Sequence, residues 1–242
     1  MRKNLLKRCI FIAIIIMILT AVFSIMIKYY VEGEKELPFS ISKILLVSTV
    51  NGKAVDDPEN IWNIDISQIN DIYMYIDKTL DGEETIKEIK IENFNVIKSP
   101  EKGELKVLRP TGELSNLYTN SEQNYLDSGI TYQGGAIDDL KSLEIANNGG
   151  IIGFRCALEN LGKYVSNETE SDIIYDGNLL KNLGVEVEEI SFNIEFDVII
   201  TTSDNISFKG ALNLDMPINT IIEEGSSNIE STDFSDVVFK RI

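Results

Sequence analysis

A run of nineteen residues without a charged side chain, Cys9 to Ile27, constrains this chain more than any other feature. The run reads CIFIAIIIMILTAVFSIMI. As an α-helix it would be about 28 Å long at roughly 1.5 Å per residue, close to the thickness of the hydrocarbon core of a bilayer. The run therefore predicts one N-terminal transmembrane α-helix that inserts residues 9–27 into a membrane.

The charges on either side of this run predict its orientation. Lys28 and then the acidic Glu32 follow the run, whereas four basic residues precede it: Arg2, Lys3, Lys7 and Arg8. Basic flanks stay on the cytoplasmic side of a membrane. We therefore expect residues 1–8 to be a cytoplasmic basic tip and residues 9–30 to be the transmembrane helix with its interface. The rest of the chain is then extracytoplasmic, on a single-pass protein of the plasma membrane.

Three alternatives in this region remain open. A cleaved signal peptide would have an apolar core of roughly 7–15 residues and then a site of small residues. This run is longer, and Phe23-Ser24-Ile25 is a poor cleavage site, so an uncleaved signal-anchor is favoured. Cys9 is either an apolar filler or an acylation site. Tyr29 and Tyr30 are either an aromatic interface pair or simply the exit of the chain.

The charge and composition of the outer part exclude several function classes. All 39 acidic residues lie after residue 30, where only 17 of the 22 basic residues lie, so this part carries a formal charge of −22. Such a charge disfavours nucleic acid, anionic lipid and other polyanions as partners. The chain has no histidine, which excludes Ser-His-Asp triads and histidine-ligated metals. Cys156 is the only cysteine beyond the apolar run, so it has no partner there for an intramolecular disulfide. We expect it to be a buried core thiol.

Apolar residues at every second position predict an outer domain that is all-β, mainly an antiparallel β-sandwich. The clearest pair runs from Ile190 to Ile200 and from Ile206 to Met216, joined by a polar turn at 202–205. Other expected strands are Ile41–Val50, Ile61–Ile66, Asp71–Asp77, Ile86–Ile97 with a bulge near Asn93, Leu105–Leu108, Leu143–Ala146 and Ile151–Leu158. Asn51-Gly52 and Asn147–Gly150 carry hairpin turn signals.

These patterns predict three regions after the membrane helix. Residues 31–40 read as a charged stalk, residues 41–220 as the β-sandwich domain, and residues 221–242 as an acidic tail with a possible edge strand at Val237–Phe239. One short helix is expected at Asn178–Leu183, ended by Gly184. The polar stretch 110–130 is interpreted as a long surface loop, with a boundary between two small domains as the alternative.

No pattern in the chain matches a catalytic signature with the required spacing. Ser40 and Lys43 fit Ser-x-x-Lys, but that dyad works on a helix, and in a strand these positions should face opposite sides. Four clusters of carboxylates lack the spacing of calcium-binding loops. They are Asp81/Glu83/Glu84, Asp138/Asp139, Glu168/Glu170/Asp172 and Glu186/Glu188/Glu189. The stretch Asn148–Gly153 lacks the Gly-Lys-Ser/Thr of a phosphate loop. We expect no catalytic residue, no metal and no cofactor.

Three aromatic residues are the candidate binding residues. Tyr73 and Tyr75 share one face of a predicted strand, so they form a candidate binding patch. Trp62 is the only tryptophan in the chain, and exposed tryptophans stack on sugars. However, Trp62 is in phase with the apolar Ile64 and Ile66, which favours a core position.

The chain resembles a family of single-pass membrane proteins of low-GC Gram-positive bacteria. The resemblance rests on the apolar run and on three segments: GEKELPFSISKILLVST, INDIYMYIDK and NNGGIIGFR. It covers most of the chain and implies a location in a bacterial plasma membrane. It implies no activity, because the family has none assigned.

The sequence therefore predicts a membrane-anchored extracytoplasmic β-sandwich that is not an enzyme. We expect it to act as an interaction or accessory module for another envelope protein. The first alternative is a domain that binds cell-wall glycan through the aromatic residues. The second is an envelope hydrolase that uses a pair of carboxylates.

Overall fold

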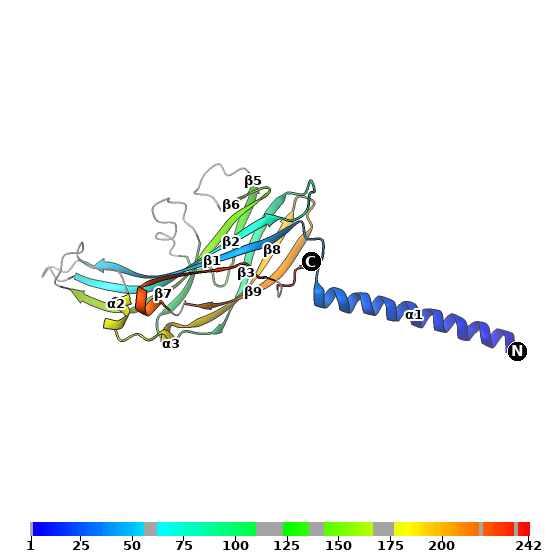
Figure 1. Ribbon diagram of the computed structural model, residues 1–242, viewed down its shortest axis with the longest axis horizontal. Helices are drawn as coiled ribbons and strands as arrows, with labels where there is room; N and C mark the ends of the chain where they lie inside the picture. Colours follow the sequence, from blue (N-terminus) through cyan, green and yellow to red (C-terminus); the bar gives the residue numbers. More distant parts are fainter. Residues whose placement is uncertain are drawn as a thin grey trace.

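A computed structural model describes residues 2–55, 62–109, 123–135, 143–166, 177–217, 220–234 and 237–242, without the side chains of residues 2–9, 54–55, 62, 166 and 177. It confirms the predicted class: one N-terminal helix is followed by a domain of two mainly antiparallel sheets. Figure 1 shows the helix, α1 (Arg2–Glu32), extending from one end of this β-sandwich. The segment Ile10–Glu32 is long and apolar enough to span a membrane.

The first sheet has five strands, all paired antiparallel. Across the sheet their order is β10 (Ser226–Ser231), β1 (Phe39–Val55), β2 (Trp62–Lys78), β7 (Gly149–Ser166) and β4 (Glu104–Leu108). The three central strands are 17 to 18 residues long, so this sheet runs the whole length of the domain.

The second sheet has six strands, and one of its pairings is parallel. Across the sheet their order is β11 (Lys240–Arg241), β9 (Ser207–Met216), β8 (Phe192–Thr202), β3 (Ile86–Lys98), β5 (Ile130–Gly135) and β6 (Glu144–Ala146). The parallel pair is β5 with β6.

The core lies between the two sheets because the long strands of both sheets turn one apolar face inward. Ile72, Met74 and Ile76 of β2 are fully buried. Phe154 of β7 meets Phe196 of β8 edge to face, with their ring centroids 5.0 Å apart. This alternation of buried and half-exposed positions is the one expected for a sandwich with solvated outer faces.

The structure confirms two strand predictions closely. The hairpin of β8 and β9 turns at 203–206 and pairs Phe192 with Met216 at its open end. The bulge in β3 lies at Asn93, whose φ of +56° shifts the register between Glu92 and Asn95. Both features were visible because they change the local alternation of apolar residues.

Two predicted breaks in the first sheet are wrong. Asn51-Gly52 is not a turn, because β1 continues to Val55 and Gly52 pairs with Ile66. The stretches 61–66 and 71–77 are not separate strands but parts of one strand, β2. The apolar pattern was interrupted between them because β2 turns two polar side chains, Gln68 and Asn70, into the core.

The predicted hairpin at Asn147–Gly150 needs a different correction. The chain does turn at Asn147-Asn148, but the two flanking strands do not pair with each other. β6 belongs to the second sheet and β7 to the first, so this turn carries the chain from one sheet to the other. Turn residues signal a change of direction, not the partner of the next strand.

Short helices close the end of the sandwich away from α1 (Figure 1). The predicted helix is α2 (Gly177–Asn182), and Gly184 follows it with a φ of +63°. Two helices of four residues were not predicted: α3 (Val187–Ile190) and α4 (Ile221–Glu224).

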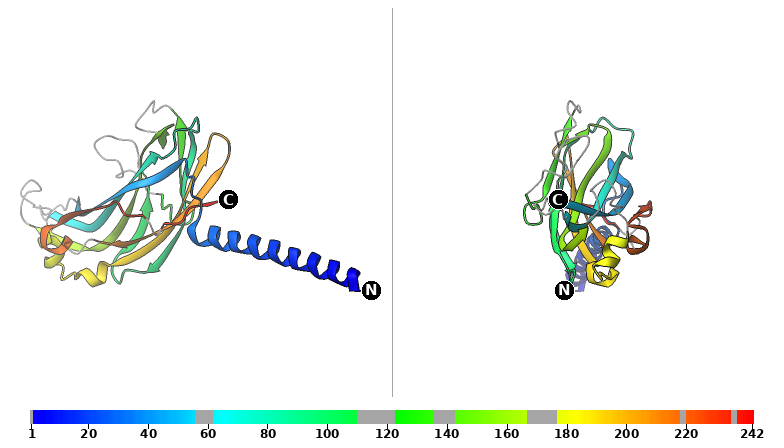
Figure 2. Two further views of the ribbon diagram at one scale, coloured as in Figure 1. Left: turned by 45° about the vertical axis from the view of Figure 1, so that its right-hand side comes forward. Right: turned by 90° about the vertical axis from the view of Figure 1, so that its left-hand side faces the viewer.

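The C-terminal tail belongs to the fold and extends the sandwich beyond residue 220. Residues 226–231 form strand β10 on the edge of β1, within the stretch that was expected to be an acidic tail. The expected edge strand at Val237–Phe239 lies directly after that range instead, at Lys240–Arg241, which pair with β9. Figure 2 shows the C-terminus beside the domain end of α1.

Candidate functional site

The two candidate tyrosines lie together on the outer face of the first sheet. Tyr73 and Tyr75 alternate along β2 with the buried Ile72, Met74 and Ile76, so their rings point away from the core. Both are half-buried. Residues two apart on one strand face are about 7 Å apart, so one extended ligand can contact both rings.

Trp62 does not join this pair. It begins β2, where its backbone pairs with Ser166, and its side chain is outside the described residues. Eleven positions separate it from Tyr73 on the same strand, about 36 Å at roughly 3.3 Å per residue. The three aromatic residues therefore do not form one binding site.

The side chain of Lys43 covers part of the Tyr75 ring. The ammonium of Lys43 lies 4.2 Å from its centroid, a cation–π geometry, and 3.3 Å from Oε2 of Glu230 on β10. Tyr73 is paired with Leu45 on one side and with Gly153 on the other. Burial raises the pKa of the Tyr73 phenol, and the charge of Asp71 raises it further.

The sequence analysis missed an ion pair next to Tyr73. Arg155 of β7 donates two hydrogen bonds to Asp71 of β2, from Nε to Oδ1 at 2.6 Å and from Nη2 to Oδ2 at 2.8 Å. Both side chains are only 13–14% exposed. This bidentate geometry fixes the guanidinium in the plane of the carboxylate, which makes it a strong form of ion pair.

An apolar cluster lies beside this ion pair on the same outer face. Leu108 and Ala157 are buried and pack with the half-buried Ile69, separately from the main core. We define the outer patch as Ile69, Tyr73, Tyr75, Leu108, Arg155 and Ala157. Only the two tyrosines were visible as candidates. Leu108, Arg155 and Ala157 reach this face through the pairing of β4 and β7, which the tertiary fold sets, and Ile69 lies between the two segments that were predicted as separate strands.

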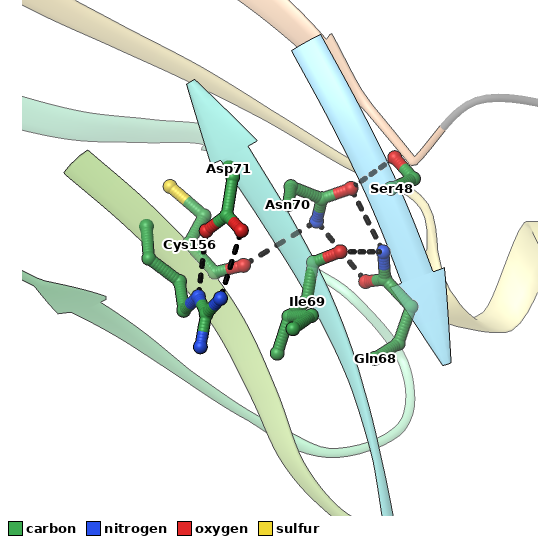
Figure 3. A network of polar contacts seen from close by, with 7 residues as sticks. Ser48, Gln68, Ile69, Asn70, Asp71 and Cys156 are labelled. Carbon is green, nitrogen blue, oxygen red and sulfur yellow. Dashed lines mark hydrogen bonds and ion pairs between the residues drawn. The ribbon is translucent and has the colours of Figure 1, made fainter. Parts of the chain in front are cut away.

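Polar side chains also meet on the inner face of the same strands, as Figure 3 shows. Asn70 accepts hydrogen bonds at Oδ1 from Ser48 (2.5 Å) and from Gln68 (2.8 Å). Its Nδ2 donates to Gln68 Oε1 at 3.1 Å and to the carbonyl of Cys156 at 3.4 Å. All three side chains are fully buried and mutually bonded, so this network organises the core rather than binding a ligand from solvent.

The end of α1 is fastened to the C-terminal segment. The N–H of Glu34 donates to the carbonyl of Phe239 at 2.7 Å, and the N–H of Arg241 donates to the Tyr29 hydroxyl at 2.8 Å. Gly33 is buried against the same segment with a φ of +72°. The predicted stalk is thus short, because α1 ends at Glu32 and β1 begins at Phe39.

A β-bulge lies between Ser40 and Lys43, the two residues of the Ser-x-x-Lys match. The register of β1 shifts between Ile41 and Lys43, which places Ser40 and Lys43 on the same outer face, contrary to our expectation. The Lys43 ammonium, however, is directed to Glu230 and to the Tyr75 ring. No general base for Ser40 is formed by this contact.

The remaining candidates from the sequence are Cys156 and the carboxylate clusters. Cys156 is fully buried beside Ile152 and Phe154, as predicted, and burial raises the pKa of its thiol. Within the described ranges, no three histidine, cysteine, aspartate or glutamate side chains are grouped to hold a metal. The clusters Asp138/Asp139 and Glu168/Glu170/Asp172 lie outside those ranges.

Comparison of the chain with protein-family models, with curated proteins and with solved structures gave no match.

Proposed function

We propose that this is a single-pass membrane protein whose β-sandwich is a non-catalytic interaction or accessory module outside the cytoplasmic membrane. One observation carries the proposal: the side chains from Ile10 to Glu32 are all exposed on an apolar helix that is joined directly to a folded domain. An apolar surface of that size is unfavourable in water and favourable in a bilayer.

The orientation follows from the basic residues before the apolar run. Arg2, Lys3, Lys7 and Arg8 favour a cytoplasmic N-terminus, which puts the sandwich on the outer side. Protease added to intact cells should then remove the sandwich, and should spare a tag placed before Arg2. Protection of the sandwich and loss of the tag would reverse the topology.

The outer patch is the surface that we propose for the protein partner. It combines aromatic rings, an arginine and buried aliphatic side chains, which are the residue types that carry the binding energy of protein interfaces. It also lies on the long rigid sheet and not on a loop. Its position predicts that the partner is another envelope protein.

Affinity purification after mild crosslinking in cells tests this proposal. The bait is the full-length protein with an N-terminal tag, and the matched variants are Tyr73→Ala/Tyr75→Ala and, as control, Ile97→Ala/Ile229→Ala. Both pairs remove exposed or half-exposed bulk, but Ile97 and Ile229 lie outside the outer patch. We expect one stoichiometric envelope partner that the tyrosine variant loses and the control retains. Absence of a partner, or equal loss in both variants, contradicts the proposal.

A wall glycan is the second candidate, and the side-by-side rings of Tyr73 and Tyr75 support it. Binding of the full-length protein to isolated cell wall should then fall in the same tyrosine variant. It should rise in Lys43→Ala, because the lysine that covers the Tyr75 ring is gone. Unchanged wall binding in both variants would remove this candidate.

A further inference from the structure

The two residues that follow Phe239 lie against the end of the apolar helix. The Lys240 ammonium is 3.9 Å from the ring centroid of Tyr30, and the N–H of Arg241 binds the Tyr29 hydroxyl. Tyr29 and Tyr30 follow the last apolar residue of the run, Ile27, by two and three positions, about 3–5 Å along the helix axis. If α1 spans a bilayer, this segment of the tail therefore lies at the level of the lipid headgroups.

These cations stand out in an acidic domain. Eight ion pairs are formed among the described residues, and none of them includes Lys240 or Arg241. Arg241 is exposed, and so is the apolar side chain of Ile242, at 65%. The Lys240 ammonium lies over the Tyr30 ring, whereas Arg241 contacts Tyr29 through its backbone N–H and is itself exposed. Cations at the level of the headgroups attract lipid phosphates.

The segment is held in this place by buried contacts. Phe239 is 5% exposed and packs over Gly210 of β9, while β11 continues the second sheet. The carbonyl of Phe239 accepts the N–H of Glu34 just after the helix. The Tyr29 hydroxyl accepts a hydrogen bond from Arg241, so its own O–H remains available to a phosphate oxygen.

We propose that Tyr29, Tyr30, Lys240 and Arg241 form a headgroup site that binds the phosphate of an anionic phospholipid in the leaflet facing the sandwich. The inference deepens the proposed function and rests on its membrane anchor. Binding at this site fixes the tilt of the sandwich, because the site belongs to both the helix and the second sheet. Charge selects the ligand: Lys240 and Arg241 favour an anionic headgroup at this site, although the chain after residue 30 carries a formal charge of −22 as a whole.

Native mass spectrometry of the full-length protein in neutral detergent tests the headgroup site. The protein is titrated with phosphatidylglycerol and, separately, with phosphatidylcholine. We expect wild-type protein to retain phosphatidylglycerol preferentially. Each lost cation should weaken this binding about fivefold, so Lys240→Ala/Arg241→Ala should weaken it about thirtyfold. The conservative variant Lys240→Arg/Arg241→Lys should keep the preference.

The matched control is Lys53→Ala/Lys98→Ala. It removes the same number of positive charges, at two exposed lysines near the C-terminal ends of β1 and β3. This control should bind phosphatidylglycerol as the wild type does. Equal binding by the Lys240/Arg241 variant, or an equal loss in the control, overturns the headgroup site. Displacement of the lipid by an equal concentration of inorganic phosphate also overturns it, because the site would then recognise free anions.

Extraction of cell membranes with alkaline carbonate separates the two proposals. If wild-type protein is extracted, the membrane anchor and with it the proposed function fail. If it resists extraction but lacks the lipid preference, only the headgroup site fails.

Discussion

Asn70 links the buried side chains of Ser48 and Gln68 in a core that is mainly apolar. Its amide is shared by Ser48 and Gln68, and each contact crosses from one buried group to another. At the next position, Asp71 faces the opposite side of the sheet and binds Arg155. A step of one residue along β2 thus separates the buried network on the inner face from the ion pair on the outer face. Substitutions on either face therefore act on the same stretch of this strand.

Replacing Asn70 should destabilise the protein strongly. Asn70→Ala leaves the Gln68 amide buried without its two mutual hydrogen bonds, and we expect a loss of about 2–4 kcal/mol in the free energy of unfolding. Guanidinium unfolding of the full-length protein in detergent measures it. Asn95→Ala, at an exposed position, should cost about 0.5 kcal/mol or less. Similar midpoints for the two variants would show that the network is not stabilising.

Tyr132 predicts a pH-dependent effect. Its hydroxyl accepts the Gly153 N–H at 3.1 Å and donates to the Gly153 carbonyl, on the part of β7 that lies beyond β4. Tyr132→Phe should therefore cost about 1–3 kcal/mol near neutral pH. Burial raises the pKa of the Tyr132 phenol well above its ordinary value, so the folded state disfavours the phenolate.

The sign of this effect can be measured. A phenol with a raised folded-state pKa contributes stability that is complete below the unfolded pKa, about 10, and is lost as the pH rises from there toward the folded pKa. The difference between wild type and Tyr132→Phe should hence shrink in unfolding experiments above about pH 10. Tyr164→Phe, a half-buried tyrosine that does not contact Gly153, serves as the control. A difference that stays constant or widens with pH would contradict the assignment.

At the scale of elements, the joint between α1 and the sandwich depends on one glycine. A Cβ on Gly33 would lie 2.4 Å from the carbonyl oxygen of Phe239, and its φ of +72° disfavours any other residue. The carbonyl is backbone and is already bound by Glu34. The C-terminal segment therefore has to move away from the helix if this residue gains a side chain.

Gly33→Ala should loosen this joint by about 1–2 kcal/mol for the backbone conformation alone. Spin labels at exposed positions on α1 and on β1, such as Ser24 and Lys53, would report it as a broader distance distribution. Gly135→Ala is the control, because a Cβ there meets nothing within 4 Å. An unchanged distribution in Gly33→Ala would mean that the joint tolerates the side chain.

At the scale of the whole molecule, the exposed apolar helix and the acidic sandwich demand different surroundings. Ile14 and Ile18 are 45% and 57% exposed on α1. A lysine at the centre of an inserted helix costs about 2.5–3.5 kcal/mol. Ile14→Lys/Ile18→Lys should thus abolish the alkali-resistant membrane fraction, as measured by carbonate extraction and immunoblotting.

The control for this change carries two lysines on the sandwich. Ile97→Lys/Ile229→Lys alters two residues of similar exposure, 55% and 53%, and should leave the membrane fraction intact. If both double variants leave the membrane, the loss reflects misfolding of the sandwich. If neither does, α1 does not hold the protein in the membrane.

Features that depend only on residues close together in the sequence could be predicted from the sequence alone. The apolar run determines α1, and strict alternation determines β8, β9 and the outward direction of Tyr73 and Tyr75. These patterns are local because burial of one strand face requires only that strand to alternate. The sequence also determined the acidic charge of the chain after residue 30.

Only the tertiary structure decided which segments meet. It joined the two halves of β2 through Gln68 and Asn70, assigned β6 and β7 to different sheets, and placed residues 226–231 on β1. It also brought Lys240 and Arg241 to the end of a helix more than 200 residues earlier in the chain. The physical reason is that strand pairing and ion pairing depend on neighbours distant in the chain, which no local period of side chains records.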